Sequence, residues 1–372
     1  MHSKPISTKV NGLLILLMLS ASINVLAQIQ VIHSSKIQEN STRDGLFYTL
    51  PRTSLVIEVT VEKTQLRKGP FSDLAAKYFP FSPFIDSNRS SFRISEILVN
   101  PVSEPDPEQV YYIQFPVRLT KESWNVGADI EPRTNALKEI NFVDKENIFP
   151  KTEKLVIDSV IKIADGKYFS NDFVRIISDG VKTREEIAKE YIGLLRQVRE
   201  SKTKLLSGFQ EIGYSKESVK FMVEELERLE NQYLDLFRGK QIVEQEKVTY
   251  QYLPESFKEG EEVPLFKFSG TQGILELRNP GVGDVVFIEI VRNGYSLAAS
   301  KIKMTNPDGT EVMAGLYYRL PEPAAITLYM NGKEISRSMA MINQFGSIRL
   351  LPPGRFKAAL DPESGALLKL VY

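Results

Sequence analysis

Residues 45–62 read GLFYTLPRTSLVIEVTVE. In the second half of this stretch, Leu55, Ile57, Val59 and Val61 alternate with Val56 and three polar or charged residues. A period of two places one set of side chains on a core face and the other set largely toward water. The stretch therefore predicts a half-buried β-strand, which the chain enters through an aromatic segment that ends in proline.

The first seven residues of that stretch, GLFYTLP, recur at residues 315–321 as GLYYRLP. Five of the seven positions are identical, and a sixth exchanges Phe47 for Tyr317. Because both copies lead into a strand, we interpret them as two related β elements with equivalent packing corners. A pair of aromatic binding platforms is the alternative interpretation.

Further strand patterns follow in the N-terminal third, and clusters that favour turns separate them. The clusters include Asn100-Pro101 and residues 104–107 (EPDP). Since proline cannot donate to a sheet ladder, we expect these prolines to mark strand boundaries. Together the patterns predict an N-terminal β-rich domain over residues 45–182. The expected strands are residues 92–99, 111–119, 137–142 and 155–163.

Residues 183–240 change to a helical period and predict an antiparallel helical hairpin. Thr183 and Glu186 form a capping box, and Gly239 stands where a C-terminal glycine cap belongs. We expect the two apolar stripes to bury each other and one side of a sheet; a membrane-surface or partner-helix face is the alternative. The stripes comprise residues 187, 191, 194, 195, 198 and 205, then, after a helix start near Ser215, residues 219, 222, 223, 226, 229, 233 and 236.

Residues 241–372 return to strand patterns and predict a C-terminal β-rich domain. Asn331-Gly332 suits a two-residue hairpin loop, and residues 306–309 (NPDG) are another turn signal. The predicted fold class is α+β, with two β-rich, sandwich- or barrel-like domains and the helical hairpin between them in the sequence. The expected strands are residues 248–252, 274–277, 285–292, 325–330, 347–351 and 367–372.

The N-terminal 27 residues have the three parts of a signal peptide. Lys4 and Lys9 supply the positive region, residues 13–19 (LLILLML) the apolar region, and small residues lead to a cleavage site after Ala27. The apolar run is shorter than the roughly 20 residues of a permanent span, and no comparable run follows. We expect an exported protein of the periplasm or cell surface, without a transmembrane segment in the mature chain, that begins with an exposed lead-in over residues 28–44.

Residue counts argue against several classes of chemistry. Removing residues 1–27, which hold two lysines and no acidic residue, leaves 45 basic and 47 acidic side chains, a balance unlike that of a nucleic-acid binder. The sequence has no cysteine, and its two histidines, His2 and His33, lie outside the predicted domains. A histidine-based triad, a Cys–His pair or a His-rich zinc site therefore cannot form in the folded body. We assign no catalytic, cofactor-binding or metal-binding residue.

Residues 78–84 read YFPFSPF and are the main candidate contact site. Prolines at 80 and 83 bar a regular helix and disfavour a central strand, so the aromatic side chains leave an irregular backbone. Exposed, Tyr78, Phe79, Phe81 and Phe84 would form an apolar patch of the kind that marks a protein contact site. Buried beneath the sheet, they would form a satellite core.

Three hypotheses about function follow. The leading one is a non-enzymatic envelope or interaction protein that docks to another envelope component. The second is a carbohydrate- or peptide-binding module, for which Trp124 is a candidate contact and a packing anchor is the structural alternative. The third is a carboxylate-dependent hydrolase, which needs only two positioned Asp or Glu side chains. Glu259, Glu261 and Glu262 are interpreted as a solvated acidic turn rather than a calcium site.

Five segments carry motifs of one known family: residues 45–51, 68–78, 230–239, 315–321 and 344–346. Together they resemble the family catalogued as domain of unknown function 4831, which consists of exported bacterial proteins. The resemblance covers nearly the whole mature chain, although residues 78–84 are richer in aromatic residues and proline than the family pattern. It implies this architecture and export, and it brings no assigned activity or catalytic residues.

Overall fold

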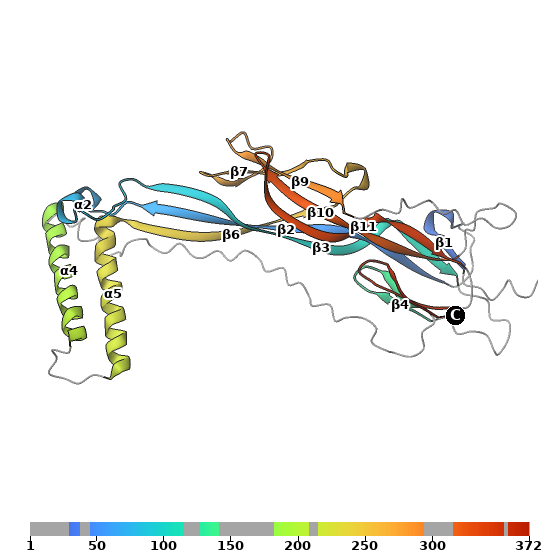
Figure 1. Ribbon diagram of the computed structural model, residues 1–372, viewed down its shortest axis with the longest axis horizontal. Helices are drawn as coiled ribbons and strands as arrows, with labels where there is room; N and C mark the ends of the chain where they lie inside the picture. Colours follow the sequence, from blue (N-terminus) through green and yellow to red (C-terminus); the bar gives the residue numbers. More distant parts are fainter. Residues whose placement is uncertain are drawn as a thin grey trace, which may run out of the picture.

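The computed structural model describes residues 30–37, 45–114, 127–140, 182–207, 215–293, 315–352 and 356–371. Within these ranges the protein has the predicted α+β fold class, with two β-sheets and three α-helices. Figure 1 shows an elongated molecule in which the two sheets overlap along part of the length. A long ribbon of β2, β3 and β6 leads from this overlap to the helices at the far end.

The larger sheet is built around β2 (Gly45–Arg67), which contains the strand predicted over residues 54–62. It pairs antiparallel with β3 (Arg89–Gln114) along almost its whole length, and its second half also pairs with β6 (Lys240–Tyr252). The sheet order is β1-β3-β2-β5-β12-β13, with β4 on β5 and β6 on β2. The shorter strands are β1 (Gln30–His33), β4 (Ala128–Glu131), β5 (Ala136–Ile140), β12 (Lys357–Leu360) and β13 (Leu367–Val371).

The smaller sheet has the order β11-β10-β9-β7-β8. Its longest strands, β10 (Leu316–Met330) and β11 (Lys333–Leu351), form a hairpin. The turn between them is the predicted Asn331-Gly332, where both residues have positive φ (53° and 69°), as a type I′ turn requires. The other strands are β7 (Val263–Ser269), β8 (Gly273–Leu275) and β9 (Asp284–Arg292).

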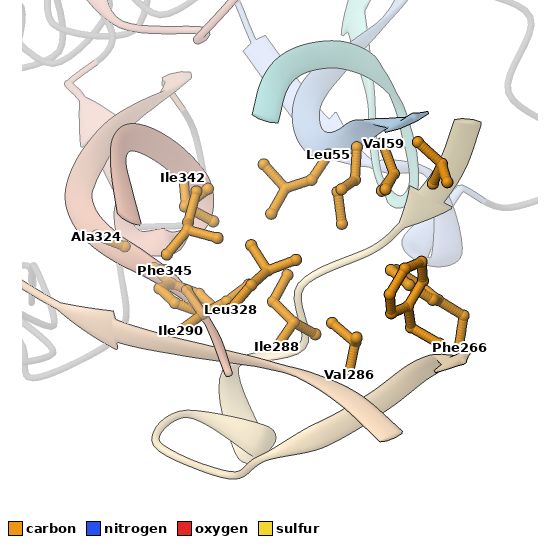
Figure 2. Packing of buried hydrophobic residues seen from close by; sticks show 14 residues of the cluster. Leu55, Val59, Phe266, Val286, Ile288, Ile290, Ala324, Leu328, Ile342 and Phe345 are labelled. Atoms are coloured by element: carbon orange, nitrogen blue, oxygen red, sulfur yellow. The ribbon is translucent and has the colours of Figure 1, made fainter. Parts of the chain in front are cut away.

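The main core lies between the two sheets, as Figure 2 shows. Leu55 and Val59 of β2 approach apolar side chains of the smaller sheet, including Phe266, Ile288 and Leu328. Complete burial of one such side chain contributes about 1.5–3 kcal/mol. The period-two pattern therefore identified the face of β2 that holds the sheets together.

The two heptapeptide copies open β2 and β10 and occupy equivalent positions. In each copy the pairing register shifts at the proline, between Thr49 and Pro51 in β2 and between Leu320 and Glu322 in β10. The backbone N–H of the fifth residue also has an equivalent partner in each copy. Thr49 donates to the carbonyl of Asn135 (2.9 Å), Arg319 donates to that of Gly365 (2.8 Å), and both acceptor residues have positive φ. These correspondences support the interpretation of equivalent packing corners.

The two copies also contact each other in a second core. The Tyr48 hydroxyl donates to the carbonyl of Tyr317 and accepts its backbone N–H, both at 3.1 Å. The ring of Tyr111 stacks on Tyr48 and on Tyr317, with centroid distances of 5.5 and 4.5 Å. Tyr48 is fully buried. This placement favours packing over the alternative of exposed aromatic platforms.

β3 continues through prolines that were expected to end it. The predicted strand at 92–99 and residues 111–114 of the one predicted at 111–119 are parts of one strand, and the prediction that Pro101, Pro105 and Pro107 mark boundaries is wrong. Along residues 89–110, β3 pairs with β2 on one side, and no other described strand pairs with it there. An edge position tolerates proline because an N–H that faces away from the ladder is not needed.

The sheet pairings cross the domain boundaries predicted from the sequence. β6, β12 and β13 come from residues assigned to a C-terminal domain, yet they belong to the sheet of β2. The predicted lead-in over residues 28–44 contributes β1, which pairs with β3 and buries Val31. Residues 115–119, 141–142, 155–163 and 306–309, for which strands or a turn were predicted, lie outside the described ranges.

The predicted helical hairpin is confirmed as α4 (Arg184–Ser207) and α5 (Lys216–Arg238). The capping box is present: the Thr183 N–H donates to Glu186 Oε2 (2.7 Å) and the Glu186 N–H to Thr183 Oγ1 (3.3 Å). Gly239, with a φ of 82°, caps α5. A third helix, α2 (Ser72–Tyr78), packs at the base of the hairpin, and η2 (Ser34–Lys36) and η3 (Ser256–Lys258) are single turns.

The hairpin does not pack on a sheet face within the described part of the chain. Its core cluster consists of residues from α2, α4, α5 and the loops beside α2, and it includes no strand residue. The expectation that the stripes cover one side of a sheet is therefore not met. The ribbon of β2, β3 and β6 carries the hairpin beyond the overlap of the sheets instead (Figure 1).

Candidate interaction surface

The candidate residues lie at the helical end, where β2 leaves the ribbon and α2 begins. Gly69 approaches the end of α5 so closely that a Cβ atom there would lie 2.5 Å from the carbonyl oxygen of Leu236. The Phe71 N–H donates to the same oxygen (2.8 Å). A glycine at 69 therefore lets the ribbon dock directly on the C-terminal turn of α5.

Tyr78 and Phe79, the first two candidates, belong to the core of this end. Their rings pack edge-on against Phe237, with centroid distances of 6.1 and 5.3 Å. Phe237 is fully buried and also contacts Phe71 (5.2 Å). For these two residues the satellite-core interpretation holds, although the core lies beneath the hairpin rather than beneath a sheet.

Phe81 and Phe84, the other two candidates on this run, face solvent. The side chain of Phe81 is 99% exposed and that of Phe84 42% exposed. The backbone around them is held in place: the Ser82 N–H donates to the Phe79 carbonyl (3.0 Å) and the Ile85 N–H to the Arg238 carbonyl (2.7 Å). We call residues 79–85 the aromatic loop.

Charged pairs of both signs lie near the aromatic loop. Lys77 pairs with Glu185 (2.5 Å), and Arg89 pairs with Asp86 (2.8 Å). The hydrogen bond from Lys77 lowers the pKa of the Glu185 carboxyl, and hydrogen bonds from Ser87 and then Arg89 lower that of Asp86. Both carboxylates are therefore charged at neutral pH. The loop thus combines exposed aromatic rings with neighbouring charged residues of both signs.

The other sequence candidates do not join this surface. Trp124 lies outside the described residues. His33 contacts Ser35 and the Glu108 carbonyl near β1, at the opposite end of the ribbon. Glu259 pairs with Arg292 (2.9 Å), which gives it a structural role. In the ranges that the structure describes, no three Asp, Glu or His side chains group in a way that could hold a metal ion.

A buried ion pair is the main polar feature that sequence reasoning missed. Arg319, only 3% exposed, donates through Nη2 to Asp106 Oδ2 (3.0 Å) and through Nη1 to the Pro51 carbonyl (2.9 Å). The pair joins the two heptapeptide corners across the sheets. A usable signal was present, because Arg319 is the position at which the second copy departs from Thr49 of the first.

The strongest pKa shifts belong to core tyrosines. Burial raises the pKa of the Tyr48 and Tyr111 hydroxyls well above the ordinary value near 10, and burial raises that of Tyr250 to about 12. The shifts favour the neutral hydroxyl, which is the form that donates in the Tyr48 contact to Tyr317. They mark packing rather than an activated nucleophile.

These tyrosines predict a loss of stability in alkali. Above about pH 10 they ionise in the unfolded chain but stay protonated in the folded chain, so the unfolded state binds fewer protons and stability falls as pH rises. Each tyrosine adds at most about 1.4 kcal/mol per pH unit to the slope of the unfolding free energy between its two pKa values, and it adds nothing to that slope below about pH 10. Urea unfolding followed from about pH 8 to about pH 12 measures the slope.

Tyr48→Phe tests the origin of that slope. The variant is less stable near neutral pH by about 1–3 kcal/mol because the two hydrogen bonds between the Tyr48 hydroxyl and the backbone of Tyr317 are lost. Its stability should nevertheless fall less steeply in alkali than that of the wild type. An unchanged slope would show that Tyr48 does not titrate in this way.

Comparisons with known proteins identify the family to which the chain belongs. None of the described helices is both long and apolar enough to cross a membrane. No curated protein and no solved structure matches the chain significantly. One family model matches residues 44–368, which include every described residue from β2 to the start of β13. The chain therefore belongs to the family described as Domain of unknown function (DUF4831).

Proposed function

We propose that the protein is an exported, non-enzymatic envelope protein that docks to another envelope protein through the aromatic loop. The observation that carries the proposal is Phe81, a large apolar side chain that is almost completely exposed on a backbone held by hydrogen bonds. Exposed aromatic residues of this kind are the usual anchors of protein interfaces, where they fill a pocket of the partner.

The loop is organised before any partner binds. Tyr78 and Phe79 hold its first residues on Phe237, and the Ile85 N–H holds its last residue on the end of α5. A side chain presented from a fixed backbone loses less conformational entropy on binding than one on a mobile segment. The arrangement therefore favours tight docking by a small contact.

The charged residues next to the loop favour a protein partner over a lipid surface. Lys77 with Glu185 and Arg89 with Asp86 place both signs of charge beside the exposed rings. An apolar centre with a polar rim is the common anatomy of protein interfaces. Lipid-surface elements typically carry an excess of basic residues instead.

Cross-linking in intact cells tests the proposal. We expect lysines next to the loop, Lys68 and Lys77, to capture one abundant envelope protein, which mass spectrometry identifies. Replacing Phe81→Ser should reduce the captured amount by about tenfold or more, because an anchor residue is lost. The unfolding free energy should change by less than about 0.5 kcal/mol, because the side chain makes no core contact.

Phe257→Ser is the matched control. Phe257 is also an exposed phenylalanine, but it lies in η3, just after the C-terminal end of β6 and away from the helices. Its replacement should leave the capture unchanged. Recovery of the chain alone, or equal losses in both variants, would contradict docking through the aromatic loop.

A further inference from the structure

The outer part of the helical hairpin has an apolar stripe that is not enclosed. At the base, near α2, the side chains of Ile187, Ala188, Leu234 and Phe237 are buried. In contrast, no residue of 199–207 in α4 or of 216–233 in α5 is buried among the residues that the structure describes. The stripe continues through this outer part at residues 205, 206, 219, 222, 223, 226, 229 and 233.

The exposed leucines lie at the two margins of the stripe of α4, about 120° apart around the helix. Leu206 is 65% exposed, and Leu194, one turn before the buried Val198, is exposed as well. Two helices in contact enclose a single line of side chains, whereas a helix whose apolar stripe spans about 100° or more needs a second neighbour to bury it. The pattern of the sequence is thus that of a larger helical bundle, of which this chain supplies two helices.

The charges of the outer hairpin are complementary to each other. Residues 192–207 of α4 carry four basic and one acidic side chain, and residues 216–227 of α5 carry two basic and four acidic ones. Arg199 and Lys202 pair with Glu230 inside the hairpin. Arg196 and Lys204 form no ion pair with other described residues, so part of this charge is free to act on a second surface.

We propose that the outer hairpin is a self-association surface, on which a second copy of this chain packs to complete a four-helix bundle. A two-fold axis parallel to the hairpins places α4 of one copy along α5 of the other, so that the basic half meets the acidic half at both contacts. The opposite orientation sets these halves against residues 184–191 and 228–238, whose charges are nearly balanced. Complementarity therefore selects the arrangement with both hairpin tips at the same end.

The shape of the molecule accommodates this arrangement. The ribbon leaves the base of the hairpin in a crosswise direction, so the sheets do not lie alongside the outer parts of α4 and α5 (Figure 1). In the two-fold pair the sheets of the copies extend away from the bundle. The aromatic loop lies at the base of the hairpin, away from the proposed bundle. Self-association and the docking proposed above therefore do not depend on each other.

Sedimentation of residues 28–372 over a range of concentrations tests the proposal. We expect a concentration-dependent shift from the mass of one chain to that of two, weakened by added salt because opposite charges meet. Leu206→Lys should raise the dissociation constant at least tenfold. Leu194→Lys lies about 120° away around α4, beyond the residues that face α5, and should leave the dissociation constant unchanged. Both side chains are exposed in the monomer, so circular dichroism should show unchanged helix content.

Control variants distinguish association through this surface from nonspecific association. Phe257→Lys, at an exposed site near the sheets, should leave the dissociation constant unchanged. Because the chain has no cysteine, a spin label at a single Lys216→Cys site reports the orientation. Tips at the same end predict label separations of about 15–25 Å across the bundle, and the opposite orientation about 35 Å or more.

Two results would overturn the proposal. One is the mass of a single chain at every concentration, including several hundred micromolar. The other is an unchanged dissociation constant in the Leu206→Lys variant. Label separations of about 35 Å or more would overturn the orientation and the charge argument behind it.

Discussion

Replacing Asp106 with alanine is expected to destabilise the protein by about 3–5 kcal/mol, because it leaves the buried guanidinium of Arg319 without its counter-charge. The two side chains lie 3.0 Å apart, and they are 4% and 11% exposed for Arg319 and Asp106. A charge that is removed from water and then left unpaired cannot recover its hydration unless the structure opens. Urea unfolding of the wild type and the variant measures the difference.

Glu104→Ala is the matched control, two residues away on the same strand. Glu104 pairs with Arg52 (2.7 Å), but both side chains are more than one quarter exposed. Its loss should cost less than about 1 kcal/mol, because water takes the place of the partner. Asp106→Ala combined with Arg319→Met should recover much of the lost stability, since no charge is then buried. Equal losses for Asp106→Ala and Glu104→Ala would contradict this account.

Replacing Phe237 with alanine is expected to destabilise the helical end by about 3–5 kcal/mol while the sheets stay folded. Phe237 is fully buried and contacts Phe71, Tyr78 and Phe79. Its cluster shares no residue with either core of the sheets, so the cavity weakens one cooperative unit more than the others. Hydrogen exchange should speed up in α4 and α5 and remain unchanged in β9 and β10.

Phe221→Ala provides the comparison on the same helix. Phe221 is exposed, and its truncation should change stability by less than about 0.5 kcal/mol. If the docking proposal holds, Phe237→Ala should also reduce the capture of a partner, because Phe79 loses the ring that holds the aromatic loop. A uniform increase in exchange across both sheets would show that the helical end is not a separate unit.

Much of the fold could be predicted because its signals are local. The alternation over residues 54–62, the capping box at Thr183 and the Asn331-Gly332 turn each depend on neighbours within a few residues. The repeated heptapeptide also located two corners that proved equivalent in their register shifts and hydrogen bonds. Such signals can be recognised in the sequence because the interactions behind them join residues that are close together along the chain.

The candidate site could be predicted only in part. The run at 78–84 was identified by composition, but composition could not separate Tyr78 and Phe79, which pack on Phe237, from Phe81 and Phe84, which face solvent. That separation depends on where α5 ends, more than 150 residues further along the chain. The Arg319–Asp106 pair was missed for the same reason, since its partners come from different strands of different sheets.

By itself, the sequence determined the type of most elements: a period of two for β2, a helical period for α4 and α5, and a glycine turn for the β10–β11 hairpin. Only the tertiary structure decided which strands pair, that residues 89–110 of β3 lie at a sheet edge where three prolines are tolerated, and that β6, β12 and β13 complete the sheet of β2. The physical reason is that periodicity and capping reflect interactions between residues that are close in the sequence. Strand pairing and the exposure of a side chain depend instead on segments that lie hundreds of residues apart.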